Sequence, residues 1–354
     1  MTLHFDLAPA EVCLIRLSAI GDTCHVVAVL RALQEAWPET RFTWIIGKVE
    51  AKLMSAVLPE IQFITFDKRA ARAEMSRIRG DLAGRRFDLL LHLQLSFRAS
   101  LISMCVRAKI RLGFDRARAR ELQWLFTNAR ISPRGNEHVL DSLLGFARAC
   151  GIEPGTPRWH IRHSDAALDY AAGLIPDDRP TLLVSPCASH GDRNWSVAGY
   201  AAIARHAANA LGMRVLLVGG PSPEEAQMGA AIESAAQCEM INQIGKDTLP
   251  LLLALIARAR VLLTPDSGPA HMATMVGTTV IGLYAATNPA RSGPYLSRAT
   301  CIDRYDAAAR RYLGRPADQI AWTTKIERQG VMDLIEVRDV IAMLDSVIRT
   351  AIVR

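Results

Sequence analysis

A short stretch late in the chain, "TPDSGPAH", places an acid, a hydroxyl, a glycine, a proline and a histidine directly after an apolar segment. Asp266 and Ser267 are residue types that cap helices. Gly268 permits a tight turn, and Pro269 fits the first helical turn, where its missing N–H costs nothing. Such a turn leaves backbone N–H groups at the positive end of a helix dipole. The stretch therefore predicts a turn that can bind an anion.

The same residues have an ordinary structural interpretation. A D-S-G-P sequence taken alone is more often a capped helix start in an α/β domain than a ligand site. The choice between the two depends on the elements that carry the turn and on the rest of the chain.

Strands and helices are predicted to alternate along the whole sequence. In the first half, short apolar segments at residues 11–17, 41–47, 61–66, 87–94 and 109–114 indicate strands, and apolar residues recur at helical spacing over 23–38. In the second half, strands are predicted at 180–186, 213–220, 240–245, 260–265 and 279–284. Helices are predicted there at 197–212, 223–237, 249–259 and 268–277, with a terminal helix at 336–354.

This alternation is typical of α/β domains with doubly wound parallel sheets. The linking segment "GIEPGTPRWHIRHS" separates two such domains, which we place at residues 1–160 and 161–354. For the terminal helix we also consider packing against the first domain. Ligand sites are expected at the carboxyl ends of the strands and in a cleft that the two domains face.

Composition supports a globular protein of this size. Half of the 354 residues are hydrophobic and 22% are charged. Seven cysteines without a C-x-x-C pair argue against a disulfide framework and a structural zinc site, and favour a reducing cytoplasm. The start of the chain does not resemble a signal peptide. Charged residues such as Arg98 and Arg258 interrupt the longest apolar stretches, so no membrane span is predicted.

Positive charge is concentrated in one region. Residues 68–134 hold sixteen Lys or Arg and five Asp or Glu, a local balance of +11 in a chain whose net charge is +7. This excess is either a solvated helical face or a platform for an anionic partner, such as membrane headgroups. Nucleic acid is not favoured, because few aromatic residues accompany the charge. Neither a G-x-G-x-x-G nor a P-loop sequence occurs. The sequence therefore disfavours a dinucleotide-binding enzyme and a P-loop nucleotide-binding protein.

Four blocks, in order, resemble a known family. They are "LIRLSAIGDTCHVVAVLRAL", "SPCASHGDRNWSVAGYAAIA", "LLVGGPSPEEAQM" and "LLTPDSGPAHMATMVGTTVIGLYAATNP", and together they are similar to the ADP-heptose:lipopolysaccharide heptosyltransferases, glycosyltransferase family 9. The resemblance implies the GT-B architecture of two Rossmann-like domains, with the acceptor mainly on the first and the nucleotide-sugar on the second. It also implies an inverting transfer of heptose from ADP-L-glycero-D-manno-heptose to the lipopolysaccharide inner core, on Kdo-lipid A or a heptosylated acceptor.

An inverting transfer needs a base that removes the acceptor hydroxyl proton. Asp22, in "SAIGD", matches the position of the family's proposed catalytic aspartate. Its alternative role is to cap the following helix. Ser18 and Gly21 in the same turn are assigned to acceptor binding on the resemblance, whereas His25 is expected to pack.

The leaving nucleoside diphosphate needs positive charge or aligned N–H groups. Arg193 occupies the place of a basic phosphate-binding residue of the family, and arginine can bind two phosphate oxygens at once. Ser189, one turn earlier, is assigned to phosphate contact, with Trp195 in the core.

The remaining donor contacts follow from the same resemblance. Asp266 would hold sugar hydroxyls, and Ser267 and Gly268 with the helix dipole would bind the diphosphate. His271 would be a nearby donor or simply a packed helix residue. Glu224, or its neighbour Glu225, would accept hydrogen bonds from the ribose unless these acids only compensate the helix dipole, and Lys246 would lie near the adenine unless it is merely exposed.

No D-x-D sequence occurs, so neither a metal nor another cofactor is expected. The expected partners are an ADP-sugar and an anionic, lipid-linked saccharide at the cytoplasmic face of the inner membrane, which the protein would contact peripherally. The alternatives are a GT-B transferase or epimerase for another nucleotide-sugar, and a nucleotide-sugar-binding protein without catalysis.

Overall fold

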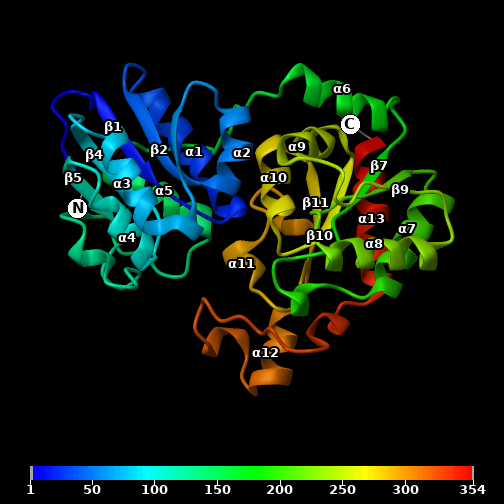
Figure 1. Ribbon diagram of the computed structural model, residues 1–354. Coiled ribbons are helices and arrows are strands. Elements are labelled where there is room, and N and C mark those ends of the chain that lie inside the picture. The colour runs from blue at the N-terminus through cyan, green and yellow to red at the C-terminus, as the bar shows by residue number, and fades with distance from the viewer. Residues whose placement is uncertain (1–2, 353–354) are drawn as a thin grey trace. The chain divides into compact units, whose positions relative to one another are not determined.

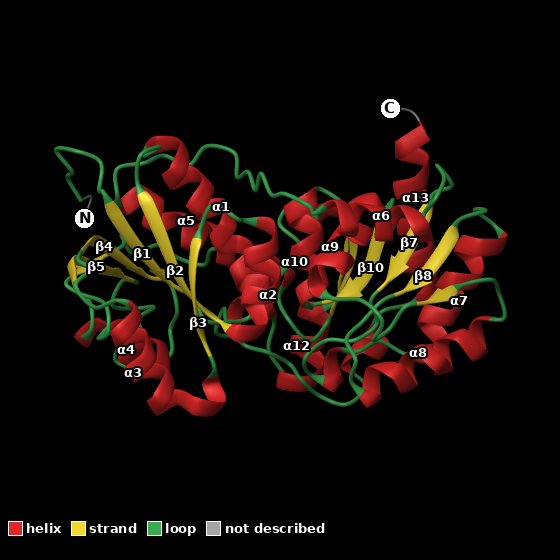
Figure 2. Ribbon diagram, turned by 45° about the horizontal axis from the view of Figure 1, so that its top comes forward, coloured by secondary structure: helices red, strands yellow, loops and turns green. Residues whose placement is uncertain are grey.

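The computed structural model describes residues 3–352, and the chain divides into two compact units, Met1–Arg162 and His163–Arg354. The boundary between the units falls two residues after the position expected from the sequence. Each unit is built around its own parallel sheet with helices on both faces (Figure 1; Figure 2).

The sheet of the first unit has the strand order β3-β2-β1-β4-β5-β6, and every pair of neighbours is parallel. The strands are β1 (Glu11–Ile15), β2 (Arg41–Gly47), β3 (Gln62–Phe66), β4 (Phe87–His92), β5 (Ala108–Gly113) and β6 (Ala129–Arg130). The helices are α1 (Ile20–Ala36), α2 (Lys48–Val57), α3 (Ala71–Asp81), α4 (Phe97–Ser103) and α5 (Val139–Ala149). This order is that of a Rossmann fold.

Buried residues on both faces of this sheet explain why its strands read as continuous apolar runs. Cys13 and Ile15 of β1 belong to a core cluster with Ile78 of α3 and Ile102 of α4. Helices α1 and α5 pack against each other, and Figure 2 shows them on the face of the sheet opposite α3 and α4.

The sheet of the second unit repeats this topology as β12-β11-β10-β7-β8-β9, again with parallel neighbours. Its strands are β7 (Thr181–Val184), β8 (Arg214–Leu217), β9 (Ile241–Asn242), β10 (Val261–Pro265), β11 (Thr279–Tyr284) and β12 (Cys301–Asp303). Its helices are α6 (Asp165–Leu174), α7 (Val197–Asn209), α8 (Pro223–Ala236), α9 (Leu249–Arg258), α10 (Gly268–Val276), α11 (Pro289–Ser292), α12 (Tyr305–Leu313) and α13 (Val337–Ile352).

The terminal helix is part of the second unit, where α13 packs on α7 and β11. Val340 and Leu344 are fully buried in the core cluster that also holds Tyr200 and Ile203 of α7. Burial of this apolar face within the second unit is what fixes the helix there.

Other differences concern element boundaries. Helix α1 begins at Ile20, three residues earlier than predicted, so Asp22 lies inside its first turn and not in the preceding loop. The two-residue strand β6 and the three-residue strand β12 escaped prediction, because edge strands this short exist only through pairing with a neighbour. Among the described helices, none has both the length and the apolar character that crossing a bilayer requires.

Candidate functional site

The order of strands reverses between β1 and β4 in the first unit and between β7 and β10 in the second. At such a switch point the connections leave in opposite directions, and the carboxyl ends of the two strands leave room for a ligand. Asp22 follows β1, Arg193 follows β7 and Asp266 follows β10. The topology therefore places the three main sequence-predicted residues at the two switch points.

Asp22 is held by Arg16, the residue that follows β1. The Nη2 atom of Arg16 forms an ion pair with Oδ2 of Asp22, and the backbone N–H of Ala19 donates to the same oxygen at 3.4 Å. Arg16 is itself positioned by donating from Nη1 to the carbonyl of Leu93, after β4, at 2.6 Å. The side chain of Asp22 remains 32% exposed. The carboxylate therefore caps the start of α1 and still faces solvent, so capping does not exclude a catalytic role.

Gln94 connects the two strands at this switch point. Its Oε1 accepts from the backbone N–H of Leu17 at 2.6 Å, and its Nε2 donates to the hydroxyl of Ser18 at 3.4 Å. This hydrogen bond holds Ser18 at the ends of the strands. Gly21 is buried in the first turn of α1, a position that favours packing. His25 is buried and its ring packs edge-on against His138, as expected.

A cavity of about 920 Å³, here named the basic pocket, lies at the carboxyl ends of β1 to β4. Leu17 and Ser18 line it, and five basic residues share it: Lys48, Lys52, Lys68, Arg69 and Arg98. Lys48 and Lys52 lie on α2, outside the basic region that the sequence singled out. The pocket therefore combines charges from segments that are separate in the sequence.

Gly47 and Glu50 form part of the wall of the basic pocket. A Cβ atom on Gly47 would collide with the carbonyl of Leu17 and the carboxylate of Glu50, so only glycine permits this close approach. Burial raises the pKa of the Glu50 carboxyl, although a backbone hydrogen bond and the charges of Lys68 and Arg16 oppose the shift. Burial therefore favours the uncharged form of Glu50, whereas Asp67, which also lines the pocket, pairs with Lys48 at 3.4 Å.

Behind the basic pocket, the buried ring of His92 joins two segments. Its Nδ1 lies 3.0 Å from Nε2 of Gln123, and its Nε2 lies 3.2 Å from the hydroxyl of Ser100. Burial lowers the pKa of His92 to about 4, and the nearby charge of Arg111 acts in the same direction. The ring is therefore neutral in the folded protein at neutral pH.

This low pKa predicts a pH-dependent stability. Between about pH 6.5 and pH 4 the unfolded chain binds a proton at His92 that the folded chain does not, so the free energy of unfolding should fall as the pH falls. The loss should approach ~3 kcal/mol, at about 1.4 kcal/mol per pKa unit. Urea unfolding of the wild type and His92→Gln across this range tests it. The variant should lack this part of the slope, and equal slopes would contradict the assignment.

In the second unit, Arg193 is held by a residue that the sequence did not reveal. The Nε and Nη2 atoms of Arg193 donate to Oε1 of Glu327 at 2.9 and 2.5 Å, and Nη1 lies 3.7 Å from Oδ2 of Asp266. Burial alone would raise the pKa of Glu327, but the hydrogen bonds and charge of Arg193, with His190, outweigh it and lower the pKa. The guanidinium keeps N–H groups on Nη1 and Nη2 that can bind a phosphate.

The turn before α10 lacks a side-chain cap. Ser267 is the N-cap residue, but its side chain makes no capping hydrogen bond; its hydroxyl instead pairs with that of Thr264 at 2.8 Å. The first N–H groups of α10, which begins at Gly268, are therefore not covered by their own cap. Asp266 accepts from the hydroxyl of Ser292 at 3.4 Å. His271 is 8% exposed, which favours packing.

The remaining predicted donor residues follow β7, β8 and β9, at the same edge of the sheet. Ser189 is exposed in the loop that leads to Arg193. Glu224 is exposed at the start of α8, whereas Glu225 folds back and accepts from the backbone N–H of Gly220 at 2.6 Å. Glu224 is therefore the more exposed acid of this pair, and its hydrogen bonds to its own backbone and to Ser222 lower the pKa of its carboxyl.

Lys246 lies on the surface, and Trp195 lies in the core as expected. The Nζ atom of the exposed Lys246 donates to the carbonyl of Asn242 at 2.5 Å. Trp195 is buried and donates from Nε1 to the carbonyl of Ile335. No group of three or more His, Cys, Asp or Glu is arranged to hold a metal ion among residues 3–352.

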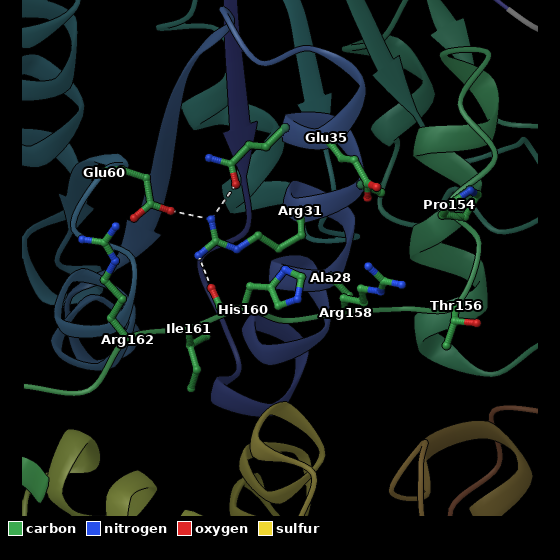
Figure 3. Close-up of a pocket in the computed structure, with 12 residues that line it drawn as sticks. Ala28, Arg31, Glu35, Glu60, Pro154, Thr156, Arg158, His160, Ile161 and Arg162 are labelled. Carbon is green, nitrogen blue, oxygen red and sulfur yellow. Dashed lines mark hydrogen bonds and ion pairs between the residues drawn. The ribbon is translucent and has the colours of Figure 1, made fainter.

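A second large cavity of the first unit, of about 770 Å³, is lined by residues that hold two segments of the unit together (Figure 3). It lies beside the second half of α1, away from the carboxyl ends of the strands. Arg31 donates to the carbonyls of Trp159 and His160, at 3.0 and 2.5 Å, and pairs with Glu60 at 2.5 Å. These contacts tie the segment that leads out of the first unit to α1.

Several residues of both sites could not be predicted from the sequence. Arg16 carried one signal, a lone charge at the end of a buried strand, and Lys48 and Lys52 carried none beyond their exposure on a helix. Glu327 lies 134 residues after Arg193, in a region without a recognisable motif, so only folding reveals their contact.

Comparison with known proteins places these sites in context. Residues 75–318 match the family model described as glycosyltransferase family 9 (heptosyltransferase). The chain is 38% identical to the lipopolysaccharide core heptosyltransferase OpsX of Haemophilus influenzae, over 96% of this chain and 97% of the relative.

Solved structures give the same fold. A family 9 glycosyltransferase from Veillonella parvula matches with a TM-score of 0.78 and 19% identity, covering 96% of this chain and 97% of its own. The E. coli ADP-heptose lps heptosyltransferase II matches with a TM-score of 0.73 and 19% identity, covering 96% and 99%. These likenesses and the two parallel sheets confirm the expected α/β fold class with GT-B architecture.

Proposed function

Since this chain belongs to glycosyltransferase family 9, the heptosyltransferases, we propose that it transfers a heptose from ADP-L-glycero-D-manno-heptose to the inner core of lipopolysaccharide, with inversion at the anomeric carbon. The relative from H. influenzae is named for lipopolysaccharide core heptosyl transfer, and a structural neighbour is named for ADP-heptose. The observation that carries the proposal is the arrangement of Arg193, Glu327 and Asp266 at the uncapped start of α10.

In the proposed reaction, Asp22 takes the proton of the acceptor hydroxyl as its oxygen attacks the anomeric carbon. The bond from that carbon to the diphosphate breaks, and ADP leaves with the electron pair. Arg16 keeps the carboxylate of Asp22 in place through their ion pair. Arg193 and the N–H groups of α10 bind the diphosphate, whose negative charge grows as the bond breaks. The protein itself supplies this positive charge, so the reaction proceeds without a metal.

The acceptor is proposed to bind in the basic pocket, with its anionic groups against the lysines of α2 and the segment after β3. A phosphorylated or carboxylated sugar such as Kdo-lipid A meets this requirement. Because such an acceptor is anchored in a bilayer, the protein would act at the cytoplasmic face of the inner membrane, in peripheral contact with it.

Replacing Lys48 and Lys68 together by alanine is expected to raise KM for the acceptor roughly three- to thirtyfold, because each exposed charge contributes up to about 1 kcal/mol. The value of kcat should change little. Steady-state kinetics at low and high salt checks this. The difference in KM between the variant and the wild type should be smaller at high salt. Lys109→Ala/Arg130→Ala removes the same charge outside the basic pocket and should behave as the wild type. An equal rise in KM for both double variants would contradict the assignment.

The function itself is tested by ADP release from ADP-heptose, measured with and without Kdo-lipid A and with EDTA. Release that depends on the acceptor and survives EDTA supports the proposal. Turnover of the nucleotide-sugar without ADP release would indicate an epimerase, and binding without turnover would indicate a nucleotide-sugar-binding protein. A strict requirement for a divalent ion would contradict the metal-free mechanism.

A further inference from the structure

Exposed apolar side chains gather next to the basic pocket. Eight large hydrophobic side chains are exposed among the described residues, and four of them fall within residues 97–125. We name these four the apolar patch: Phe97, Met104, Leu122 and Leu125, each between 45% and 59% exposed. Exposure of this kind costs solvation free energy unless the side chains meet an apolar partner.

The loop that carries Leu122 and Leu125 is anchored from within. Gln123, fully buried between them, donates from Nε2 to the carbonyls of His92 and Gln94 at 2.8 and 3.2 Å, and accepts from the N–H of Phe114 at 3.1 Å. The side chain of Gln123 points into the interior of the unit, whereas those of Leu122 and Leu125 are exposed. The exposed leucines are therefore displayed by a fixed loop.

The backbone of this loop turns sharply at its tip. Glu121 and Leu122 have φ angles of +48° and +61°, a left-handed conformation that disfavours residues other than glycine. Such a conformation persists only where surrounding contacts impose it. Here Glu121 accepts a hydrogen bond from the backbone N–H of Phe97 at 2.6 Å, which joins the loop to the start of α4.

Further contacts join the remaining parts of the apolar patch. The rings of Phe97 and Phe126 meet edge-on with centroids 6.1 Å apart. Arg111 donates to the carbonyl of Ser103, beside Met104, at 2.9 Å and to that of Phe126 at 2.8 Å. The two segments, α4 and the loop at residues 120–126, therefore form one connected surface.

Charge and position indicate what covers this surface. Arg98 and Arg120 lie beside Phe97 and Leu122 in the sequence, and the guanidinium of Arg116 lies 5.0 Å from the ring centre of Trp124, all within the region whose local balance is +11. Phe97, Arg98 and Glu121 also line the basic pocket, so the surface is continuous with the proposed acceptor site. Leucines and a phenylalanine with arginines close by match the boundary of a bilayer, where acyl chains lie beneath anionic headgroups.

We propose that the apolar patch inserts into the headgroup region of an anionic membrane and thereby presents the basic pocket to a lipid-linked acceptor. The inference rests on the proposed function for the identity of that acceptor. Leu122 and Leu125 enter the bilayer boundary, while the flanking arginines bind lipid phosphates. Contact with the membrane is therefore apolar as well as electrostatic.

The test uses co-sedimentation of the full chain with vesicles of phosphatidylethanolamine and phosphatidylglycerol. Leu122→Ser/Leu125→Ser should weaken partitioning roughly tenfold, since two half-exposed leucines lose their burial in the interface. The matched control is Leu168→Ser/Leu296→Ser, which removes two leucines of similar exposure from the second unit, and it should bind as the wild type does. Vesicles of phosphatidylcholine alone should bind all three proteins weakly.

A second measurement distinguishes an effect of the apolar patch on membrane binding from an effect on the transfer reaction. Activity on a deacylated, water-soluble acceptor should be the same for Leu122→Ser/Leu125→Ser and the wild type, whereas activity on the vesicle-bound acceptor should fall. Unchanged vesicle binding by this variant would overturn the proposal, as would an equal loss for the control variant. Wild-type binding to a protein partner through these leucines, without vesicle binding, would also overturn it. The vesicle assay contains no substrate, so its outcome does not depend on the proposed transfer.

Discussion

Replacing Asp22 by asparagine is expected to lower kcat by about a hundred- to ten-thousandfold, the range that general base catalysis contributes. Asparagine preserves the size of the side chain and can still accept the hydrogen bond from the N–H of Ala19. It cannot take a proton from the acceptor hydroxyl. Binding of ADP, which we propose to involve the second unit, should remain within about twofold of the wild type, since a base acting on the acceptor contributes nothing to donor affinity.

Two controls keep this result interpretable. Asp81→Asn also removes a carboxylate from an arginine pair of the first unit, at 2.6 Å from Nη1 of Arg77, and it should retain full activity. Arg16→Lys preserves a positive charge beside Asp22 but loses the guanidinium geometry, so a moderate fall in kcat is expected. Turnover of Asp22→Asn equal to that of the wild type would remove the residue from the mechanism.

Replacing Arg193 by alanine is expected to weaken ADP binding by about 1.5 to 3 kcal/mol, the value of a hydrogen bond to a charged group. This corresponds to roughly a ten- to 150-fold rise in the dissociation constant. The value of kcat should fall as well, because the leaving diphosphate gains charge in the transition state. Isothermal titration with ADP and steady-state kinetics measure the two effects separately.

Glu327 complicates this variant in a way that can be measured. Alanine at position 193 leaves the carboxylate of Glu327 without its guanidinium partner, beside the site where the diphosphate would bind. Part of the loss would then be repulsion. The double variant Arg193→Ala/Glu327→Gln should bind ADP more tightly than Arg193→Ala alone. Equal ADP affinity for the wild type and Arg193→Ala would assign the arginine to a purely structural pair with Glu327.

Much of this arrangement was predictable because it is local. Apolar runs of four to seven residues specified most of the strands, and their alternation with helices specified two parallel sheets. The turn "TPDSGPAH" predicted the start of α10, because proline restricts the backbone angles of its residue and glycine widens them. Asp22, Arg193 and Asp266 could be proposed as site residues for the same reason, since each lies in the turn or loop after a predicted strand and within a recognisable block.

Only the tertiary structure brought together residues that no spacing connects. Arg16 meets both Asp22 and the carbonyl of Leu93 because β1 and β4 are neighbours in the sheet. The pairing of Arg193 with Glu327, the lysines of α2 in the basic pocket and the apolar patch have the same origin. The sequence by itself determined the elements and the chemistry at their ends, since both follow from the preferences of neighbouring residues. The partners of those groups depend on strand order and on the packing of distant segments, which no local preference specifies.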